Sequence, residues 1–247
     1  MPLSLGYHAE SIFGKATMED LALDRVLPST AYERLKGDIL RGAYRPGEKL
    51  LMSALKARYA LGTGPMREVL AQLVAQRLVV AINQKGYRVA SMSLAEMKDI
   101  YEARARLEAL MVTIAVERGD DGWEALIIAH EHTLAKVVEV RTPDEMVDIW
   151  DSRHKAFHNA IASGCKSKSL MQARAYLFDQ AERYRQIWLK RTVLSEEALQ
   201  IKREEHSRLI KALLSRDAEK SSNLMFAHLM TPVPIIAKII EEEADSL

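Results

Sequence analysis

Four histidines in the second half of the chain are spaced so that their imidazoles could meet around one cation. His154 and His158 are four residues apart, which places both on one face of a helix. His206 and His228 follow on later predicted helices, and apolar neighbours at helical spacing allow all four rings to point inward. Imidazoles that converge from separate helices suit a borderline divalent ion such as Zn²⁺ or Ni²⁺. The spacing therefore predicts a metal site.

Each histidine taken singly has a simpler interpretation, a hydrogen-bonded side chain in the core or on the surface. We assign His8, His130 and His132 to that class. A metal held by histidines can also activate water, so a metal-dependent hydrolase is an alternative function. The sequence offers no convincing general base for such an enzyme.

The segment that carries these histidines is helical by pattern and lacks strand patterns. The capping box from Ser93 to Glu96 opens a helix that runs toward Arg118. Further helices are predicted over residues 122–140, 143–163, 167–191, 195–215 and 217–240, the last bent or interrupted by Pro232 and Pro234. The side chains expected to be buried in the second helix are Trp123, Leu126, Ile127, Leu134 and Val138. Six helices in residues 93–247 predict an antiparallel bundle in a mainly α chain.

Residues 25–92 have the pattern of a helix-turn-helix followed by a β hairpin, the order of a winged helix. The turn takes residues 60–65, and apolar runs at 78–82 and 87–90 form the hairpin. Such a fold presents the first turn of its second helix to the major groove of DNA, and the hairpin tip to a minor groove. The apolar face of the first helix combines Leu50, Leu51, Ala54, Leu55 and Tyr59, and that of the second combines Met66, Val69, Leu70, Leu73 and Val74.

The partner that this pattern predicts is double-stranded DNA. From Arg25 to Ser93 there are 12 Lys and Arg against 4 Asp and Glu, a net charge of +8, whereas residues 94–247 carry 22 against 26, a net charge of −4. Counterion release from phosphates therefore favours DNA binding by the first part only. A winged helix used for protein contacts is the alternative. The candidate DNA-contacting residues are Ser53, Gly62, Thr63, Gly64, Arg67, Lys85 and Gly86.

Composition sets the remaining limits. The 247 residues are 48% hydrophobic, which is ample for a core in each part. We expect no membrane association, because we find no apolar run of bilayer length and no signal-peptide pattern. Cys165 is the single cysteine, which excludes an intrachain disulfide and favours the cytoplasm. Residues 1–24 are predicted to form a flexible arm.

Three segments of the N-terminal part carry a family signature. Tyr32–Gly42 and Arg45–Leu50 resemble the opening of GntR-family regulators, and Pro65-Met66-Arg67-Glu68-Val69-Leu70 resembles their recognition-helix signature P-V-R-E-A-L. The family usually has S-R-T just before that proline, where this chain has Gly62-Thr63-Gly64. An arginine that commonly reads guanine is absent, so Thr63 and Arg67 become the expected base or phosphate contacts. The operator should differ from the common sequence of the family.

The spacings of His158, His206 and His228 are similar to those of a metal site in the FCD effector domain, in the FadR branch of that family. The family site combines an Asp-x-x-x-His pair with two later histidines, and this chain has His154 where the aspartate usually stands. Imidazole is a competent ligand, so the resemblance implies a divalent metal site, with one more unit of positive charge. Asp151, one turn earlier, could compensate as a supporting partner or as a ligand.

The resemblance also implies a small carboxylate effector, held at an open metal position and clamped by guanidinium groups. Arg104 matches the arginine of the family's E-x-R-x-x-L-E stretch, in Glu102–Glu108, and is the first candidate. Arg174, Tyr184 and Arg185 on the fourth helix are further candidates, with a solvated basic face as the alternative. The extra positive charge favours a dicarboxylate. Likeness to one family member at residues 52–62, 83–93 and 188–195 implies glutarate or a related C4–C5 acid.

Together these features predict a homodimeric, ligand-responsive transcription regulator, a repressor that releases operator DNA when the acid binds. A dimer is expected because one short recognition helix covers too little DNA, whereas a two-fold dimer reads two half-sites. An architectural DNA-binding protein with a vestigial pocket is a further alternative.

Overall fold

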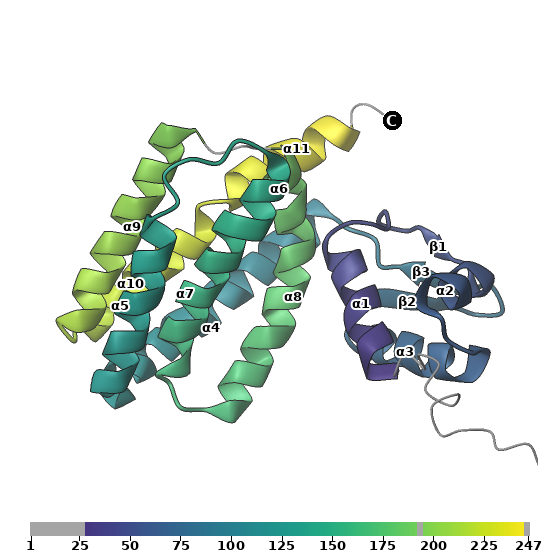
Figure 1. Ribbon diagram of the computed structural model, residues 1–247, viewed down its shortest axis with the longest axis horizontal. Coiled ribbons are helices and arrows are strands. Elements are labelled where there is room, and N and C mark those ends of the chain that lie inside the picture. The colour runs from purple at the N-terminus through teal and green to yellow at the C-terminus, as the bar shows by residue number, and fades with distance from the viewer. Residues whose placement is uncertain (1–27, 192–194, 245–247) are drawn as a thin grey trace, which may run out of the picture.

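The computed structural model of the chain describes residues 28–191 and 195–244, and the arm expected over residues 1–24 lies outside them. Its three strands form an antiparallel sheet in the order β1-β3-β2. Figure 1 shows this sheet together with the first helices on one side of the molecule. The elements of this part are α1 (Pro28–Leu40), β1 (Lys49–Leu50), α2 (Met52–Tyr59), α3 (Thr63–Ala75), β2 (Val79–Ile82) and β3 (Gly86–Val89).

Local backbone conformation explains the turn between α2 and α3. Helix α2 ends where Ala60 adopts a left-handed conformation with φ 51°, and Gly62 precedes α3 in an extended conformation. The turn is shorter than predicted, because Thr63 already begins the helix. At the hairpin tip Gly86 has φ +88°, a conformation that favours glycine.

The core of the winged helix confirms most of the predicted apolar positions, with Leu55 and Tyr59 of α2 fully buried. Two expectations were wrong: Leu51 is exposed because it lies at the N-cap of α2, and Ala54 also faces solvent. Strand β1 was not predicted, because two residues cannot display the alternation that reveals a strand.

The C-terminal part is a bundle of helices. Within residues 94–191 and 195–244 all six predicted helices are present, with the third divided among α6, a π-helix named η1 and α7, and the sixth divided into α10 and α11. Six of these helices begin at a side-chain cap, in which the residue before the helix accepts a hydrogen bond from a backbone N–H in the first turn. The elements are α4 (Leu94–Arg118), α5 (Asp121–Ala135), α6 (Pro143–Glu145), η1 (Met146–Asp151), α7 (Ser152–Ser163), α8 (Lys168–Arg191), α9 (Glu196–Leu214), α10 (Ala218–Met230) and α11 (Val233–Ala244).

The second predicted helix differs from the expectation at two positions. Helix α5 ends at Ala135, so Val138 lies in the following loop, where 64% of it is exposed. Leu126 is also exposed, because the buried face of α5 follows Trp123, Ile127 and Leu134. Leu126 lies next to that face and does not belong to it.

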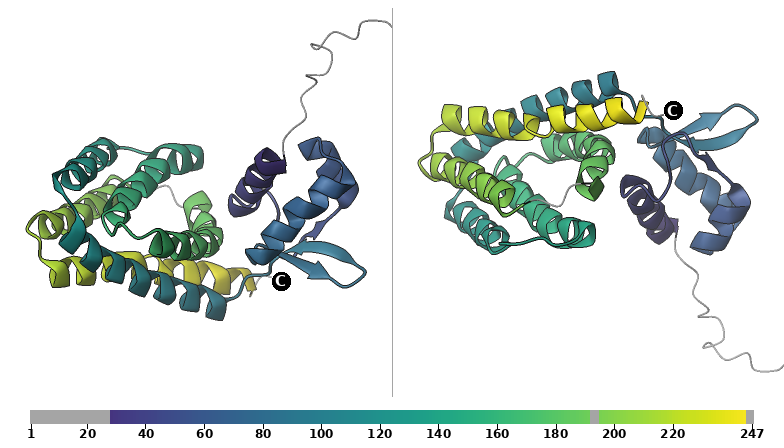
Figure 2. Two further views of the ribbon diagram at one scale, coloured as in Figure 1. Left: turned by 90° about the horizontal axis from the view of Figure 1, so that it is seen from below. Right: turned by 90° about the horizontal axis from the view of Figure 1, so that it is seen from above.

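The end of the chain is more apolar than expected. The segment Ala218–Glu242 is long and apolar enough, by length and composition alone, to cross a membrane, which corrects the expectation that no run reaches that length. Its side chains Met225, Leu229 and Ile236 lie in the core of the bundle. Figure 2 shows α10 and α11 running beside α4 along one side of the bundle.

Helix α8 lies between the two parts of the molecule. It packs against α4 within the bundle and against α1 of the winged helix. Figure 1 shows α8 facing α1 across the junction, and Figure 2 shows the two parts as separate lobes that meet there. Side chains on different faces of this one helix can therefore contact both lobes.

Candidate metal centre and anion cavity

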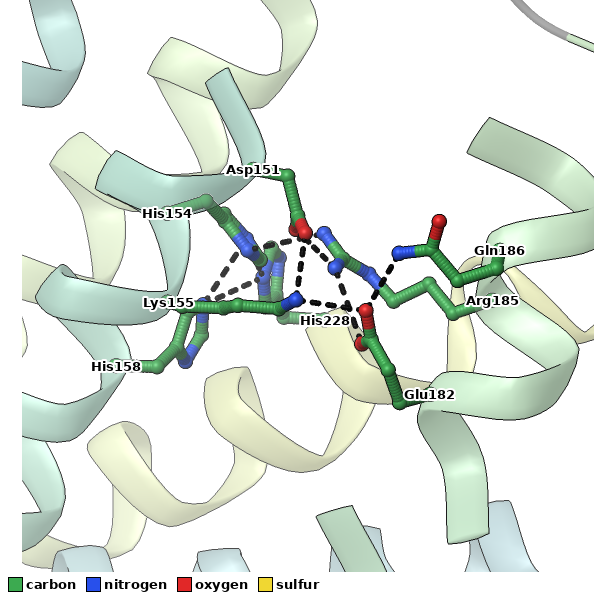
Figure 3. Close-up of polar contacts among 8 residues, drawn as sticks. All are labelled: Asp151, His154, Lys155, His158, Glu182, Arg185, Gln186 and His228. Carbon is green, nitrogen blue, oxygen red and sulfur yellow. Dashed lines mark hydrogen bonds and ion pairs between the residues drawn. The ribbon is translucent and has the colours of Figure 1, made fainter. Parts of the chain in front are cut away.

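Three helices bring the four predicted histidines together in the bundle. Helix α7 carries His154 and His158, α9 carries His206, and α10 carries His228. The Nε2 atom of His158 lies 3.1 Å from Nε2 of His154 and 3.1 Å from Nε2 of His228, and the latter two are 3.4 Å apart (Figure 3). One ligand atom from each of the four rings lies within 4.8 Å of all the others.

The chemistry of this nitrogen triangle fits a cation at its centre. An imidazole Nε2 is either a donor or an acceptor, so three mutually close Nε2 atoms always include one pair of two donors or two acceptors. A bound cation removes this conflict, because every Nε2 can then direct a lone pair toward it. Neighbouring donors about 2.0–2.1 Å from one ion are separated by roughly 2.9–3.4 Å, which the observed distances match. Nε2 of His206 is buried without a hydrogen-bond partner among the described residues.

Burial keeps these imidazoles neutral. It lowers the pKa values of His154, His158 and His206 well below the ordinary value, and the proximity of other imidazoles lowers them further. The pKa of His228 is also lowered by burial, although a hydrogen bond with Glu205 opposes the shift. A neutral imidazole is the form that binds a metal ion, so the site does not require proton loss near neutral pH.

Supporting contacts orient the outer sides of the rings. Glu205 Oε2 lies 2.9 Å from Nδ1 of His228, which directs Nε2 of that ring toward the cluster. Burial raises the pKa of Glu205, but hydrogen bonds from His228 and Lys202 lower it to about 2. The ring of Trp150 stacks on His154 at a centroid distance of 4.6 Å and an interplanar angle of 16°.

The π-helix η1 places two buried side chains next to the histidines. Its wider turn contains both Trp150 and Asp151. Asp151, which was expected to support or join the metal site, forms ion pairs with Arg185 and with Lys155, whose Nζ lies 2.7 Å away. The structure thus places Asp151 among cations and not among the ligand atoms. Single π-turns often occur at functional sites.

A cavity of about 620 Å³, including its open mouth, lies against the histidine cluster. Its walls combine aromatic and aliphatic side chains with four cations. The hydroxyl of Tyr101 is buried there without a hydrogen-bond partner among the described residues, and burial raises its pKa to about 12. This hydroxyl is therefore a free donor for a polar ligand. The four cations that line the cavity are Arg104, Lys155, Arg185 and Lys202.

Each of these cations already has a carboxylate partner. Arg104 Nε donates to Glu108 at 2.7 Å, and Lys202 Nζ donates to Glu205 at 2.9 Å. Lys155 and Arg185 share Asp151 and Glu182, and Nε2 of Gln186 donates to Glu182 at 2.6 Å (Figure 3). A second anion in this cavity must therefore compete with a carboxylate of the protein.

The structure separates the four predicted effector residues. Arg104 and Arg185 line the cavity, whereas Arg174 and Tyr184 do not. Arg174 Nε lies 3.1 Å from Glu108 and its Nη1 donates to Asn159, so it supports Glu108 from behind. Because all four side chains are buried, the alternative of a solvated basic face is wrong for the three on α8.

Tyr184 instead lies at the junction between the two lobes. Its hydroxyl donates to Glu96 at 2.5 Å and accepts a hydrogen bond from the backbone N–H of Ser93 at 3.3 Å. The cavity face of α8 follows Phe178, Arg185 and Trp188, whereas Tyr184 belongs to the neighbouring face. The structure therefore places Tyr184 outside the cavity wall, and its predicted contact with an effector gains no support from this position.

Sequence analysis missed Tyr101, Lys155 and Lys202 in the cavity wall. Tyr101 precedes Arg104 by almost one helical turn, and Lys155 stands between two predicted metal ligands. Those positions were a usable signal. Lys202 offered a similar signal, because it precedes the predicted ligand His206 by four residues on one face of a helix.

The junction face of α8 holds the winged helix through polar contacts. Arg183 Nη2 donates to the carbonyl oxygens of Ala90 and Ser91 at 2.8 and 2.7 Å, in the segment that joins the wing to α4. Gln180 Nε2 donates to Gln76 O at 2.6 Å. Lys36 of α1 forms an ion pair with Asp179 at 2.6 Å. These contacts lie on the same helix as the cavity wall.

The predicted DNA-contacting residues all lie on the surface of the winged helix. The N-terminus of α3 has no side-chain cap, and a Cβ at Gly64 would meet no atom within 4 Å. The backbone N–H groups of its first turn therefore face open space, with exposed Arg67 next to them. The exposed residues of this set are Ser53, Gly62, Thr63, Gly64, Arg67, Lys85 and Gly86.

Comparison with known proteins identifies the type of chain. Residues 27–89 match the bacterial regulatory proteins of the gntR family, and residues 99–231 match the FCD domain. The chain is 55% identical to the HTH-type transcriptional repressor GlaR of Escherichia coli K12, over 83% of this chain and 93% of that protein. It is 32% identical to the HTH-type transcriptional regulator BphR of Paraburkholderia xenovorans LB400, over 95% of each. GlaR is the family member that residues 52–62, 83–93 and 188–195 resemble, so the resemblance inferred from the sequence is confirmed.

Solved structures show the same fold. The structure of E. coli McbR/YncC is similar with a TM-score of 0.71 at 20% identity, covering 86% of this chain and 97% of that chain. A putative GntR transcriptional regulator from Rhodococcus sp. RHA1 is similar with a TM-score of 0.62 at 18% identity, covering 85% of this chain and 96% of that chain. The predicted mainly α architecture, a winged helix-turn-helix plus a helical bundle, is thereby confirmed.

The relatives also decide between the classes of function considered from the sequence. They are transcription regulators, so the hydrolase alternative is wrong. The chain belongs to the GntR family of bacterial regulatory proteins, with an FCD domain in its C-terminal part.

Proposed function

We propose that the chain is a homodimeric cytoplasmic repressor that releases operator DNA when its FCD domain binds a small dicarboxylate. Glutarate or a related C4–C5 acid is the proposed effector. One observation carries this proposal: four imidazoles, two buried and two half-buried, converge beside a cation-lined cavity whose α8 wall also holds the winged helix. The name of the relative GlaR supports repression as the direction of control.

The DNA-binding role is assigned to residues 25–92, whose net charge of +8 contrasts with the net charge of −4 of residues 94–247. The uncapped start of α3 offers backbone N–H groups to a phosphate, and Thr63 and Arg67 contact the major groove beside it. Lys85 and Gly86 at the hairpin tip approach a minor groove, while Ser53, Gly62 and Gly64 complete the contact surface.

The metal role is assigned to His154, His158, His206 and His228. All four donors are imidazole nitrogens, a set that suits Zn²⁺ or Ni²⁺. A bound ion that accepts more than four donors supplies a position for one carboxylate oxygen. Because this chain has a histidine in place of an aspartate, the protein ligands contribute no negative charge of their own.

The effector role is assigned to the cavity wall. Arg104 and the free hydroxyl of Tyr101 lie one turn apart on α4, where both can donate hydrogen bonds to a carboxylate. Aromatic side chains, among them Trp150 and Trp188, cover the methylene groups of a short acid. Arg185 adds positive charge from α8.

Coupling between the two sites is assigned to α8. A carboxylate that competes for Arg185 or Lys155 changes the ion pairs of Glu182 on α8. The same helix holds the winged helix through Gln180 and Arg183, so its displacement changes the orientation of the DNA-binding lobe. Operator affinity falls by the difference in acid affinity between the two arrangements, typically about 1–3 kcal/mol.

The dimer is proposed from the requirements of DNA recognition and from exposed apolar surface. Leu110 of α4 and Ile235 of α11 are exposed on neighbouring helices of the bundle. A second copy that covers this surface would present two recognition helices to two half-sites.

The deciding experiment measures operator release. Purified protein loaded with Zn²⁺ or Ni²⁺ is bound to a DNA fragment selected from random sequences, and glutarate is titrated in while fluorescence anisotropy follows the DNA. We expect glutarate to release the DNA from metal-loaded protein, and to release none after a chelator has removed the metal. If no C4–C5 acid alters DNA affinity, the effector proposal is wrong, and if chelation changes nothing, the metal proposal is wrong.

A further inference from the structure

We propose that Lys155 receives the second carboxylate of the effector and makes the cavity select dicarboxylates over monocarboxylates. This inference rests on the proposed function, in which the first carboxylate lies at the histidine cluster. Lys155 follows the ligand candidate His154 directly in α7 and lines the same cavity.

The position of the Lys155 ammonium group suits this role. Its Nζ lies 2.7 Å from Asp151 Oδ2 and 2.6 Å from Glu182 Oε1, and the ring of Phe178 lies 5.7 Å away. Figure 3 shows the lysine side chain crossing in front of the histidine cluster, with its Nζ directed toward the carboxylates beyond it. Because the histidines and this ammonium group line the same cavity, their arrangement suits a short acid with a carboxylate at each end.

Lys155 is also the most accessible cation of the cavity wall. Its side chain is 29% exposed, compared with 13% for Lys202, 7% for Arg104 and 6% for Arg185. A partly hydrated ammonium group on a flexible stem exchanges one carboxylate for another with little desolvation cost. The buried guanidinium groups of Arg104 and Arg185 would instead have to break ion pairs that are already shielded from solvent.

The carboxylates that Lys155 would leave remain paired. Asp151 keeps its ion pair with Arg185, and Glu182 keeps both Arg185 at 3.5 Å and the amide of Gln186 at 2.6 Å. Moving Lys155 to a ligand therefore leaves Arg185 as a cation shared by both carboxylates, so neither is left without a cationic partner, which would otherwise oppose binding strongly. A monocarboxylate held at the histidines has no second group for Lys155, so it gains nothing from this exchange.

The test compares two acids of equal length on metal-loaded protein. Isothermal titration calorimetry gives the dissociation constants of glutarate and of pentanoate, and their ratio is the dicarboxylate preference. We expect the native protein to prefer glutarate by about 10- to 100-fold, as one charge-assisted hydrogen-bonded pair provides. In Lys155→Met the ratio should fall to about threefold or less, and Lys155→Arg should restore most of it.

One further variant makes the result specific. Lys166→Met removes a lysine charge outside the cavity, at an exposed ion pair with Asp120, and should keep the preference for glutarate. Circular dichroism and elemental analysis verify that each variant is folded and metal-loaded. A preference that persists in Lys155→Met, or disappears in Lys166→Met instead, overturns the inference while leaving the proposed function standing. Native protein that binds neither acid overturns both.

Discussion

The histidine cluster depends on residues that do different physical tasks. Burial and mutual proximity keep the imidazoles neutral, Glu205 orients His228, and Trp150 covers His154. His206 differs from the others because its Nε2 has no partner among the described residues. A buried nitrogen of this kind is costly unless a ligand satisfies it.

His206→Ala should therefore lower metal content and acid response while operator binding stays largely intact. Removal of a direct ligand should weaken metal affinity by more than the roughly 10- to 100-fold typical of losing a supporting contact. Elemental analysis and DNA anisotropy are the measurements. Arg67→Ala is the matched variant in the other lobe, expected to weaken operator binding with metal content unchanged. Equal loss of DNA binding in both variants would contradict this division of tasks.

Glu108 should contribute stability that depends on pH. Burial acts to raise its pKa, but Arg104 and Arg174 hold that pKa below the ordinary carboxyl value. A lowered pKa in the folded state gives stability that is fully present above the unfolded-state pKa and is lost as pH falls through the folded-state value.

Glu108→Gln leaves two buried guanidinium groups without their carboxylate, so we expect a loss of about 3–5 kcal/mol in unfolding free energy at pH 7. Urea unfolding at pH 7 and at progressively lower pH measures it. The difference in unfolding free energy between native and variant protein should narrow below about pH 4.5, since only the native protein has this carboxylate to protonate. A gap that is constant with pH would show that charge is not the cause.

At the scale of single elements, α8 combines two faces with two tasks. Phe178, Arg185 and Trp188 face the cavity, whereas Gln180 and Arg183 face the winged helix. An α-helix is stiff along its axis, so under the proposed coupling a change of ion pairs on one face would move the contacts on the other.

Arg183→Leu should uncouple acid binding at the cavity face of α8 from DNA binding by the winged helix. The apolar replacement keeps much of the buried volume but cannot donate to the carbonyl oxygens of Ala90 and Ser91. Metal content and acid binding should remain, while the effect of acid on operator affinity, typically about 5- to 150-fold in such couplings, should approach onefold. Calorimetry for the acid and anisotropy for DNA separate the two quantities. Full acid-driven release in this variant would place the coupling outside α8.

The helices and the histidine cluster could be predicted because local sequence signals mark them. Caps such as Ser93 and apolar periodicity revealed the helices, and four histidines at helical spacing revealed the cluster. No local signal marks η1, because a π-turn depends on tertiary packing. The misplacement of Tyr184 arose because charged and aromatic residues occupy every face of α8. Only the packed structure shows which of those faces meets the cavity.

At the scale of the whole molecule, net charge and proposed function are both divided between the winged helix and the helical bundle. The basic winged helix and the acidic remainder have opposite net charge, so phosphate attraction is confined to one lobe. The cavity proposed for the effector lies in the other lobe, where an anion would meet local cations within an acidic domain. This division reduces the competition between DNA and a small acid for the same positive charges.

The stacking of Trp150 on His154 has an optical consequence. An indole stacked on a ring of the proposed metal site would emit light under the influence of any ion bound there. Ni²⁺, with its partly filled d shell, provides a route for non-radiative decay, whereas Zn²⁺, with a closed shell, does not. The protein thus contains its own fluorophore for following ion exchange in solution, without any attached dye.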